Sequence, residues 1–113
     1  MNPLRPIKFR KKINMRNMWY DRQGNSVNNM EWIESKLSDN SYKRVAETTL
    51  SDGKWISTVW LGLDYSHGNG PPLIFETMVF EFIDNRPSEI DMQRYSTEED
   101  AIIGHLEMVK KYE

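Results

Sequence analysis

The amino-acid sequence predicts an α+β fold: an antiparallel sheet of about four strands with two helices packed on one face. Three observations favour this class. Apolar segments with the length of strands flank a loop rich in Gly and Pro, within residues 57–82. An Asp-Gly dipeptide just before them indicates a hairpin. Two further segments, one near each end of the chain, have the apolar spacing of helices.

Length and composition limit the classes of protein to consider. A chain of 113 residues has the size of one domain. Its 38% hydrophobic and 28% charged residues are typical of a globular protein. Four Trp, five Tyr and four Phe predict a core rich in aromatic rings. The absence of Cys excludes disulfides, thiolate metal sites and cysteine nucleophiles.

The charge divides the chain into a basic N-terminal arm, residues 1–17, and a domain, residues 18–113. The first 20 residues hold six basic side chains and no acidic one, whereas the other 93 hold nine basic and 17 acidic residues, a net charge of −8. Such an arm can fold back on the acidic domain or reach an anionic partner. No apolar segment has the length of a membrane helix, and no signal peptide is recognisable, so we expect a cytoplasmic protein.

The first helix is predicted over Val27–Leu37. Apolar residues recur there at i, i+3, i+6 and i+10, through Met30 and Ile33. Ser26 or Asn25 is the expected N-cap, because their side-chain oxygens can accept a bond from a free backbone N–H of the first turn.

The second helix is predicted to begin at a capping box, with Ser96 as N-cap and Glu99 bonding back to it. Ile102, Leu106 and Val109 form one apolar stripe, and Ala101, His105, Met108 and Tyr112 lie beside it. We expect this helix to pack on the sheet.

A strand over residues 42–50 is predicted to turn at Asp52-Gly53. Asp-Gly favours a two-residue type I′ turn, in which both central residues have positive φ. Such a turn would pair Leu50 with Trp55.

The remaining strands are predicted from the alternation of apolar residues and from the polar, proline-containing loops between them. Residues 55–63 are partly apolar on both faces, which predicts a central strand. A loop over 64–72 ends in two prolines, and the next strand is expected over 73–82. A second polar loop over 84–90 and a short strand over 91–95 complete the predicted sheet.

Polar and aromatic residues around the 64–72 loop are the candidate ligand site. A buried Glu76 would have to be paired or protonated, and arginine matches phosphate oxygens in a bidentate manner. In the alternative interpretation Glu76 pairs with Arg44, Arg94 or a tryptophan N–H, and the tryptophans fill the core. Both interpretations stay open. The candidate ligand-binding residues are Trp19, Tyr20, Arg44, Trp60, Asp64, His67, Glu76 and Arg94.

Catalytic and cofactor chemistry have little support in the sequence. Asp64, Ser66 and His67 are close in the chain and could supply a base and a nucleophile, but no G-x-S-x-G turn is present. Backbone hydrogen bonds within the loop explain these residues more simply. The segment Gly68–Pro71 matches no phosphate-binding motif, and two His without ligand spacing indicate no metal site. We therefore expect no cofactor.

Five segments, WYDRQGN, KRVAETTL, STVWLGLD, GPPLIFETMVF and RYSTEEDAIIGH, resemble in order and spacing a family of small proteins of tailed phages and prophages. The resemblance runs from Trp19 to about Met108 and leaves residues 1–17 outside. The family pattern often has an Asp-His pair after WLGL, whereas Tyr65 follows Asp64 here. The resemblance implies a phage accessory protein but supplies no catalytic residues.

These observations lead to three functional hypotheses. The first is a non-catalytic phage protein in the cytoplasm of the bacterial host that counters host defence, by binding a host protein or sequestering a small anionic, nucleotide-like ligand. The second is a nucleic-acid-binding module that uses the arm, because clustered cations bind phosphates. Its residues would be Lys8, Arg10, Lys11, Lys12 and Arg16. The third is a small hydrolase-like enzyme that uses His67. A homodimer is compatible with each of them.

Overall fold

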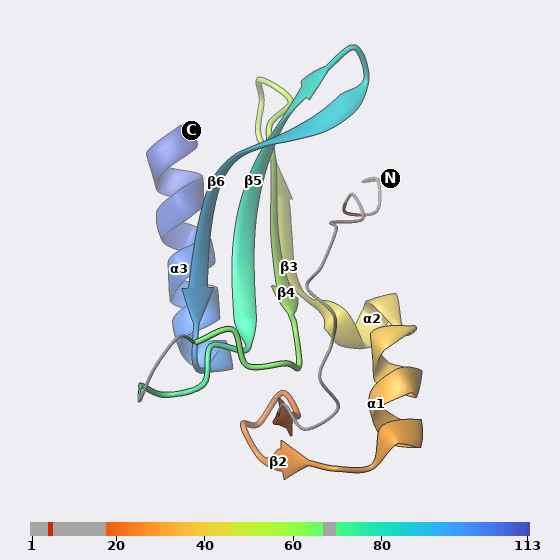
Figure 1. Ribbon diagram of the computed structural model, residues 1–113. Helices are drawn as coiled ribbons and strands as arrows, with labels where there is room; N and C mark the ends of the chain where they lie inside the picture. Colours follow the sequence, from red (N-terminus) through yellow and green to blue (C-terminus); the bar gives the residue numbers. More distant parts are fainter. Residues whose placement is uncertain (1–4, 6–17, 67–69) are drawn as a thin grey trace.

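The computed structural model describes residues 5, 18–66 and 70–113 (Figure 1). Its centre is a four-stranded antiparallel sheet in which each strand pairs with the next along the chain, in the order β3-β4-β5-β6. The strands are β3 (Arg44–Thr49), β4 (Trp55–Trp60), β5 (Phe75–Ile83) and β6 (Arg86–Tyr95). The predicted α+β class and antiparallel sheet are confirmed, with residues 55–60 in a central strand as expected.

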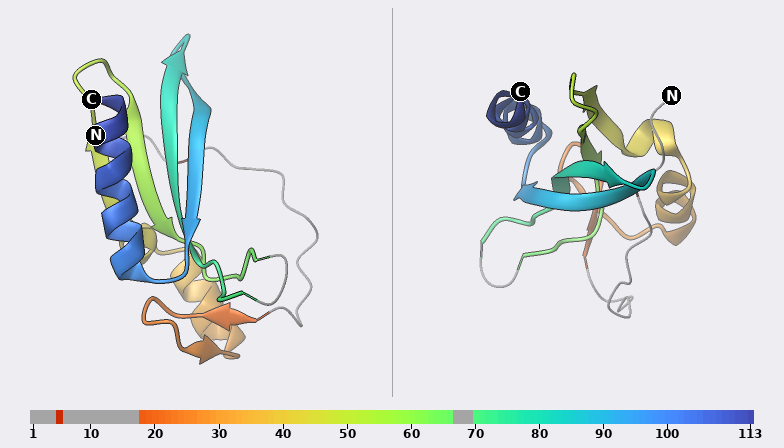
Figure 2. Two further views of the ribbon diagram at one scale, coloured as in Figure 1. Left: turned by 90° about the vertical axis from the view of Figure 1, so that its left-hand side faces the viewer. Right: turned by 90° about the horizontal axis from the view of Figure 1, so that it is seen from above.

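Helix α3 (Glu98–Tyr112) lies along one face of the sheet (Figure 2). Its cap is Thr97 and not the predicted Ser96: the Thr97 hydroxyl accepts from the Asp100 N–H at 3.1 Å. Gly104 brings the helix close to β6, because a Cβ at this position would overlap ring atoms of Tyr95.

The side of α3 that faces the sheet is formed mainly by residues beside the predicted apolar stripe. Its buried residues are Ala101, Gly104, His105 and Met108. Ile102 and Leu106 of the predicted stripe are 44% and 62% exposed. The helix therefore packs on the sheet as expected, but through the residues beside that stripe. The small Ala101 and Gly104 allow the closer approach, which periodicity of large apolar residues does not reveal.

The first part of the chain packs at the end of the sheet where β4 finishes (Figure 1). It contains β1 (Trp19–Tyr20), β2 (Ser26–Val27), α1 (Met30–Leu37) and the short α2 (Asn40–Lys43). Helix α1 starts later than predicted, because Val27 pairs with Trp19 in a small antiparallel ladder. The N-cap is Asn29, whose side chain accepts from the Trp32 N–H at 3.1 Å, and neither Ser26 nor Asn25.

An aromatic cluster joins these helices to the sheet. Trp60, at the end of β4, has its ring centroid 5.0 Å from Tyr42 and 6.2 Å from Trp32, both in edge-to-face contact. Trp60 also packs with Phe75 of β5 and Ala101 of α3. Edge-to-face contacts add about 0.5–1.5 kcal/mol to the burial of each pair. The predicted aromatic core is therefore confirmed where these helices meet the sheet.

The β3–β4 hairpin turns in three residues instead of the predicted two. The Leu50 N–H donates to the Lys54 carbonyl at 2.8 Å, which leaves residues 51–53 in the loop. Gly53 has φ +91°, while Asp52 is not among the residues of positive φ, so a type I turn is followed by a left-handed glycine. Trp55 consequently pairs with Thr49 and not with Leu50.

The two-residue turn occurs instead between β5 and β6. Asp84 and Asn85 have φ of 52° and 64°, and Ile83 pairs with Arg86 across them. Strand β6 begins directly after this turn, so the predicted loop over 84–90 is wrong beyond the turn, and the strand predicted over 91–95 begins five residues earlier. Asp and Asn tolerate the left-handed region through their short polar side chains, which allows this turn without glycine.

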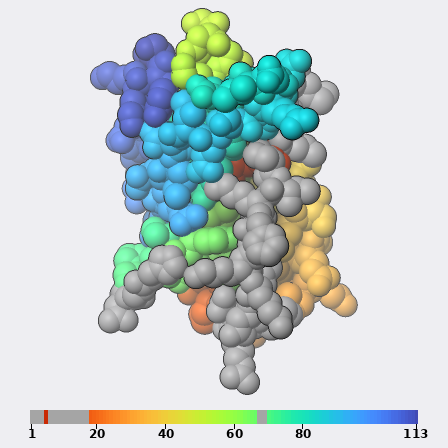
Figure 3. Space-filling view, turned by 45° about the horizontal axis from the view of Figure 1, so that its top comes forward, coloured from red at the N-terminus to blue at the C-terminus, as the bar shows by residue number. Residues whose placement is uncertain are grey.

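Among the described strands, β6 is at one edge of the sheet, and the space-filling view shows it at the surface beside α3 (Figure 3). Pro87 near its start cannot donate to a further strand. Register also shifts between Val79 and Phe80 opposite β6, and such irregularities discourage edge-to-edge pairing. Within the described part of the chain, no helix is long and apolar enough to cross a membrane.

Candidate functional site

Three of the candidate ligand residues belong to the core at the junction of β1 and β4. The Trp60 indole Nε1–H donates to the Tyr20 carbonyl at 2.9 Å. Trp19 forms an isolated bridge with Leu63. Trp19 and Trp60 are only 4% and 1% exposed. These two rings hold elements together and do not line an open surface.

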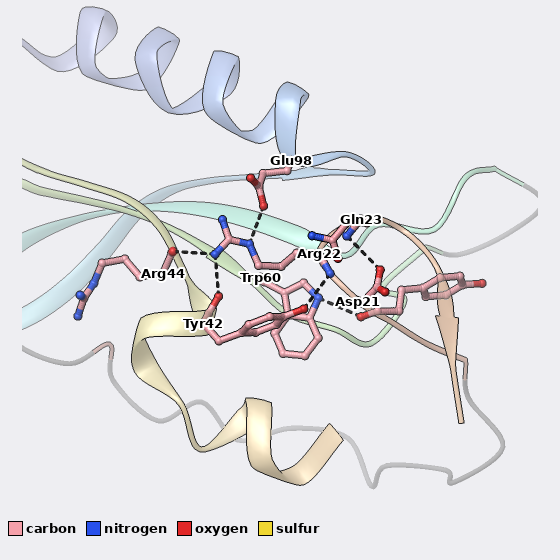
Figure 4. Close-up of polar contacts among 8 residues, drawn as sticks. Asp21, Arg22, Gln23, Tyr42, Arg44, Trp60 and Glu98 are labelled. Carbon is pink, nitrogen blue, oxygen red and sulfur yellow. Dashed lines mark hydrogen bonds and ion pairs between the residues drawn. The ribbon is translucent and has the colours of Figure 1, made fainter. Parts of the chain in front are cut away.

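The neighbouring Arg22 was not singled out from the sequence, and it connects three elements (Figure 4). Its Nε lies 2.5 Å from Glu98 Oε1, in the first turn of α3. Its Nη1 donates to the Tyr42 carbonyl at 3.0 Å and to the Arg44 carbonyl at 3.4 Å. A planar guanidinium can bond in several directions at once, which makes Arg22 a clamp between the first part of the chain and the sheet.

Two other candidates, Glu76 and Arg94, are neighbours on adjacent strands. Arg94 Nε lies 3.0 Å from Glu76 Oε2, and Arg94 also places its guanidinium carbon 4.8 Å from the centre of the Tyr65 ring. The second carboxylate oxygen, Oε1, lies 3.1 Å from Nη1 of Arg5. The pairing of Glu76 with Arg94, one of the two interpretations of Glu76, is thus present.

Glu76 belongs to the sheet face that points away from α3. On β5 its neighbours on this side are Met78 and Phe80, and Phe80 stacks on Trp55 of β4 at 5.1 Å between centroids. We call this surface, formed by Trp55, Glu76, Met78 and Phe80, the Glu76 face. Its residues are between 0% and 4% exposed. Arg5 lies against it, with its guanidinium carbon 5.9 Å from the Phe80 ring centre.

The remaining candidates are not part of this cluster or are not described. Arg44 pairs with Glu47 at 3.2 Å, three residues along β3. Asp64 closes its own loop: one oxygen accepts from the N–H groups of Ser66 and Leu73 at 2.7 and 2.9 Å. This agrees with the interpretation of that loop as one held by backbone hydrogen bonds. His67 and the arm residues Lys8, Arg10, Lys11, Lys12 and Arg16 lie outside the described residues.

A buried polar chain under α3 was missed by the sequence analysis. His105 Nε2 lies 2.8 Å from the Thr48 hydroxyl, and Nδ1 lies 2.7 Å from the Thr58 hydroxyl. Thr58 in turn contacts Thr77 at 2.5 Å. Burial lowers the pKa of His105, because desolvation disfavours the imidazolium. Polar residues within three predicted strands, Thr48, Thr58 and Thr77, were the available signal.

The second missed feature is the outer face of α3, which we define as Ile102, Ile103 and Leu106. Their side chains are 44%, 47% and 62% exposed. They occupy neighbouring positions on the helix, since residues three and four apart share a side. Their partners could not be inferred from periodicity, because both sides of α3 contain apolar residues.

Among the described residues, no group of three His, Asp or Glu side chains could hold a metal ion. Comparison of the chain with protein-family models, curated proteins and solved structures finds no match. The similarity to phage and prophage proteins therefore stays a prediction from the sequence motifs.

Proposed function

We propose that this protein is a non-catalytic binding protein of phage origin that acts in the host cytoplasm and counters host defence by occupying a host protein. The observation that carries the binding part is the outer face of α3. The phage origin and the defence target rest on the sequence motifs.

The outer face of α3 has the properties of a docking helix. Its opposite side already packs on the sheet, so Ile102, Ile103 and Leu106 are not needed for the core. Clustered exposed apolar side chains mark interaction surfaces, and apolar anchors at i and i+4 are typical of a helix that lies in a partner's groove. Each side chain is about half exposed, so its full burial would contribute on the order of 1 kcal/mol.

The charges around this face indicate the chemistry of the partner. Glu99, Asp100 and Glu107 are exposed on the same helix, and Lys110 is exposed one turn after Leu106. A host protein with an apolar groove, and with basic residues beside the first turns of α3, would match both the aliphatic centre and the mainly acidic border. Complementary charge chiefly raises the association rate and the specificity of such a complex.

The structure gives less support to the small-ligand form of this hypothesis. Trp19 and Trp60 are core residues, and Arg44 and Arg94 each pair with a glutamate of the same sheet. A nucleotide-like ligand would have to displace these contacts. We therefore favour a protein target over a sequestered nucleotide.

The test compares Leu106→Glu with Ile83→Glu, a control at a similarly exposed position on the β5–β6 hairpin. Each tagged variant is expressed in the bacterial host, the bound host protein is identified, and its Kd for each purified variant is measured by calorimetry. We expect Leu106→Glu to weaken binding at least tenfold and Ile83→Glu to leave it unchanged. A host partner retained equally by both variants would contradict the proposal.

Two further results would change the proposed function. A homodimer that Leu106→Glu converts to a monomer, with no host partner bound, would assign this face to self-association. A nucleotide that co-purifies with the wild-type chain in native mass spectrometry, and is lost in a folded Arg94→Ala variant, would favour the sequestering form.

A further inference from the structure

Glu76 and Arg94 form a complete ion pair within the sheet. Glu76 is 4% exposed, and Arg94 is fixed both by Glu76 Oε2 and by the Tyr65 ring. One guanidinium balances one carboxylate. The sheet alone therefore neutralises this buried charge, which is the main requirement for burying it.

The ion pair with Arg94 uses Oε2 of Glu76, so Oε1 can accept from a second donor. That donor comes from a residue that is distant in the sequence. Arg5 Nη1 lies 3.1 Å from Oε1, and the same guanidinium lies over Phe80. Phe80 is held in place by stacking on Trp55. An oriented carboxylate oxygen beside a fixed aromatic ring is the combination that binds a planar guanidinium in preference to an ammonium.

We infer that the Glu76 face is a recognition site for an arginine side chain. Arg5 occupies it in the isolated chain, and an arginine-bearing basic segment of a partner protein binds there by displacing Arg5. The net charge of −8 outside the first 20 residues draws basic segments toward this domain. The site lies on the opposite side of the sheet from α3, so it is independent of the function proposed above.

Displacement of Arg5 is an exchange of one guanidinium for another. Its ion pair with Glu76 exchanges for an equivalent pair with the incoming guanidinium, so no buried charge is left without a partner. The resident Arg5 acts as a competitor at high effective concentration, because it belongs to the same chain. Incoming segments therefore bind the wild-type protein more weakly than a protein without Arg5.

The experiment uses the full chain and its Arg5→Ala variant. The probe is a synthetic peptide with the sequence of residues 1–12, titrated by NMR at physiological salt. We expect Arg5→Ala to bind this peptide at least tenfold more tightly than wild type, with the largest shifts on β5 and β6. A peptide carrying Arg5→Lys has the same charge and should bind at least fivefold more weakly.

Two variants separate the site from general attraction of a basic peptide. Glu76→Gln in the Arg5→Ala background should abolish the arginine preference. Phe80→Leu in the same background keeps an apolar residue and should reduce it, so the test stands if one variant fails to fold. Equal binding by wild type and Arg5→Ala, equal binding of the arginine and lysine peptides, or no displacement from wild type at millimolar peptide would each overturn the inference.

Discussion

His105 of α3 and Glu76 of β5 are buried against opposite faces of one sheet, with 3% and 4% of their surfaces exposed. They differ in whether the groups around them carry charge. Glu76 contacts two guanidinium groups, so its ionised form is compensated. His105 contacts the hydroxyls of Thr48 and Thr58, which carry no charge. In a neutral imidazole one nitrogen donates and the other accepts, and a threonine hydroxyl can satisfy either. The structure therefore favours neutral His105.

This difference predicts how stability depends on pH. Burial lowers the pKa of His105 in the folded state, so the unfolded state takes up the proton first as the pH falls. The contribution of His105 to the unfolding free energy should be fully present above its unfolded pKa of about 6.5 and should decrease below that pH. The slope from this group is at most about 1.4 kcal/mol per pH unit. Chemical denaturation between pH 7.5 and 5 measures it.

The control for this prediction is His105→Gln, which keeps one donor and one acceptor but does not titrate. Its unfolding free energy should be lower than that of wild type at pH 7.5 and nearly constant down to pH 5.5. Asp91 does not interfere: bonds from Lys111 and Tyr112 lower its pKa in the folded state, and an unfolded aspartate has a pKa of about 3.9, so both states titrate below the measured range. Parallel curves for wild type and variant would contradict this role of His105.

At the scale of elements, the sequence predicted the presence of the main strands and of both longer helices, but not how they face or turn. Asp52-Gly53 was assigned a type I′ turn, which occurs at Asp84-Asn85 instead. A dipeptide preference favours a hairpin, but the loop length depends on which residues of the two strands must reach the core. For Glu76 the pairing with Arg94 was one of two predicted outcomes, since spacing cannot tell which side of a strand is covered.

Gly53 allows a direct test of the turn. Its φ of +91° disfavours any residue with a side chain, although no atom lies within 4 Å of the position that an alanine methyl group would take there. Gly53→Ala should therefore lower the unfolding free energy by about 1 kcal/mol through backbone strain alone.

Gly70 is the matched control, because it has equal space around it and no positive φ. Gly70→Ala should be neutral or slightly stabilising, since alanine restricts the unfolded chain. Thermal denaturation of both variants is the measurement. Equal losses of stability would mean that the conformation of Gly53 is not the cause.

At the scale of the whole molecule, two kinds of contact hold the first part of the chain at the end of the sheet where β4 finishes. Trp60 supplies the apolar contact there, through Tyr42 and Trp32. Arg22 supplies the polar one, since its guanidinium joins the carbonyl of Tyr42 to Glu98 at the start of α3. These links connect segments that are distant in sequence, which explains why motif spacing did not reveal Arg22.

Removing this clamp should loosen one region before the others. In Arg22→Ala, the Tyr42 carbonyl and Glu98 both lose a charged donor, which should lower the unfolding free energy by about 1–3 kcal/mol. Hydrogen exchange should accelerate in β1, β2 and α2, while β4 and β5 keep their protection relative to global unfolding. Arg22→Lys should recover only part of the loss, because an ammonium cannot reproduce the planar fork.

Arg86→Ala, at an exposed position on β6, is the control and should change neither the unfolding free energy nor the exchange rates. Uniform acceleration across the sheet would instead place Arg22 within a single cooperative unit with the core.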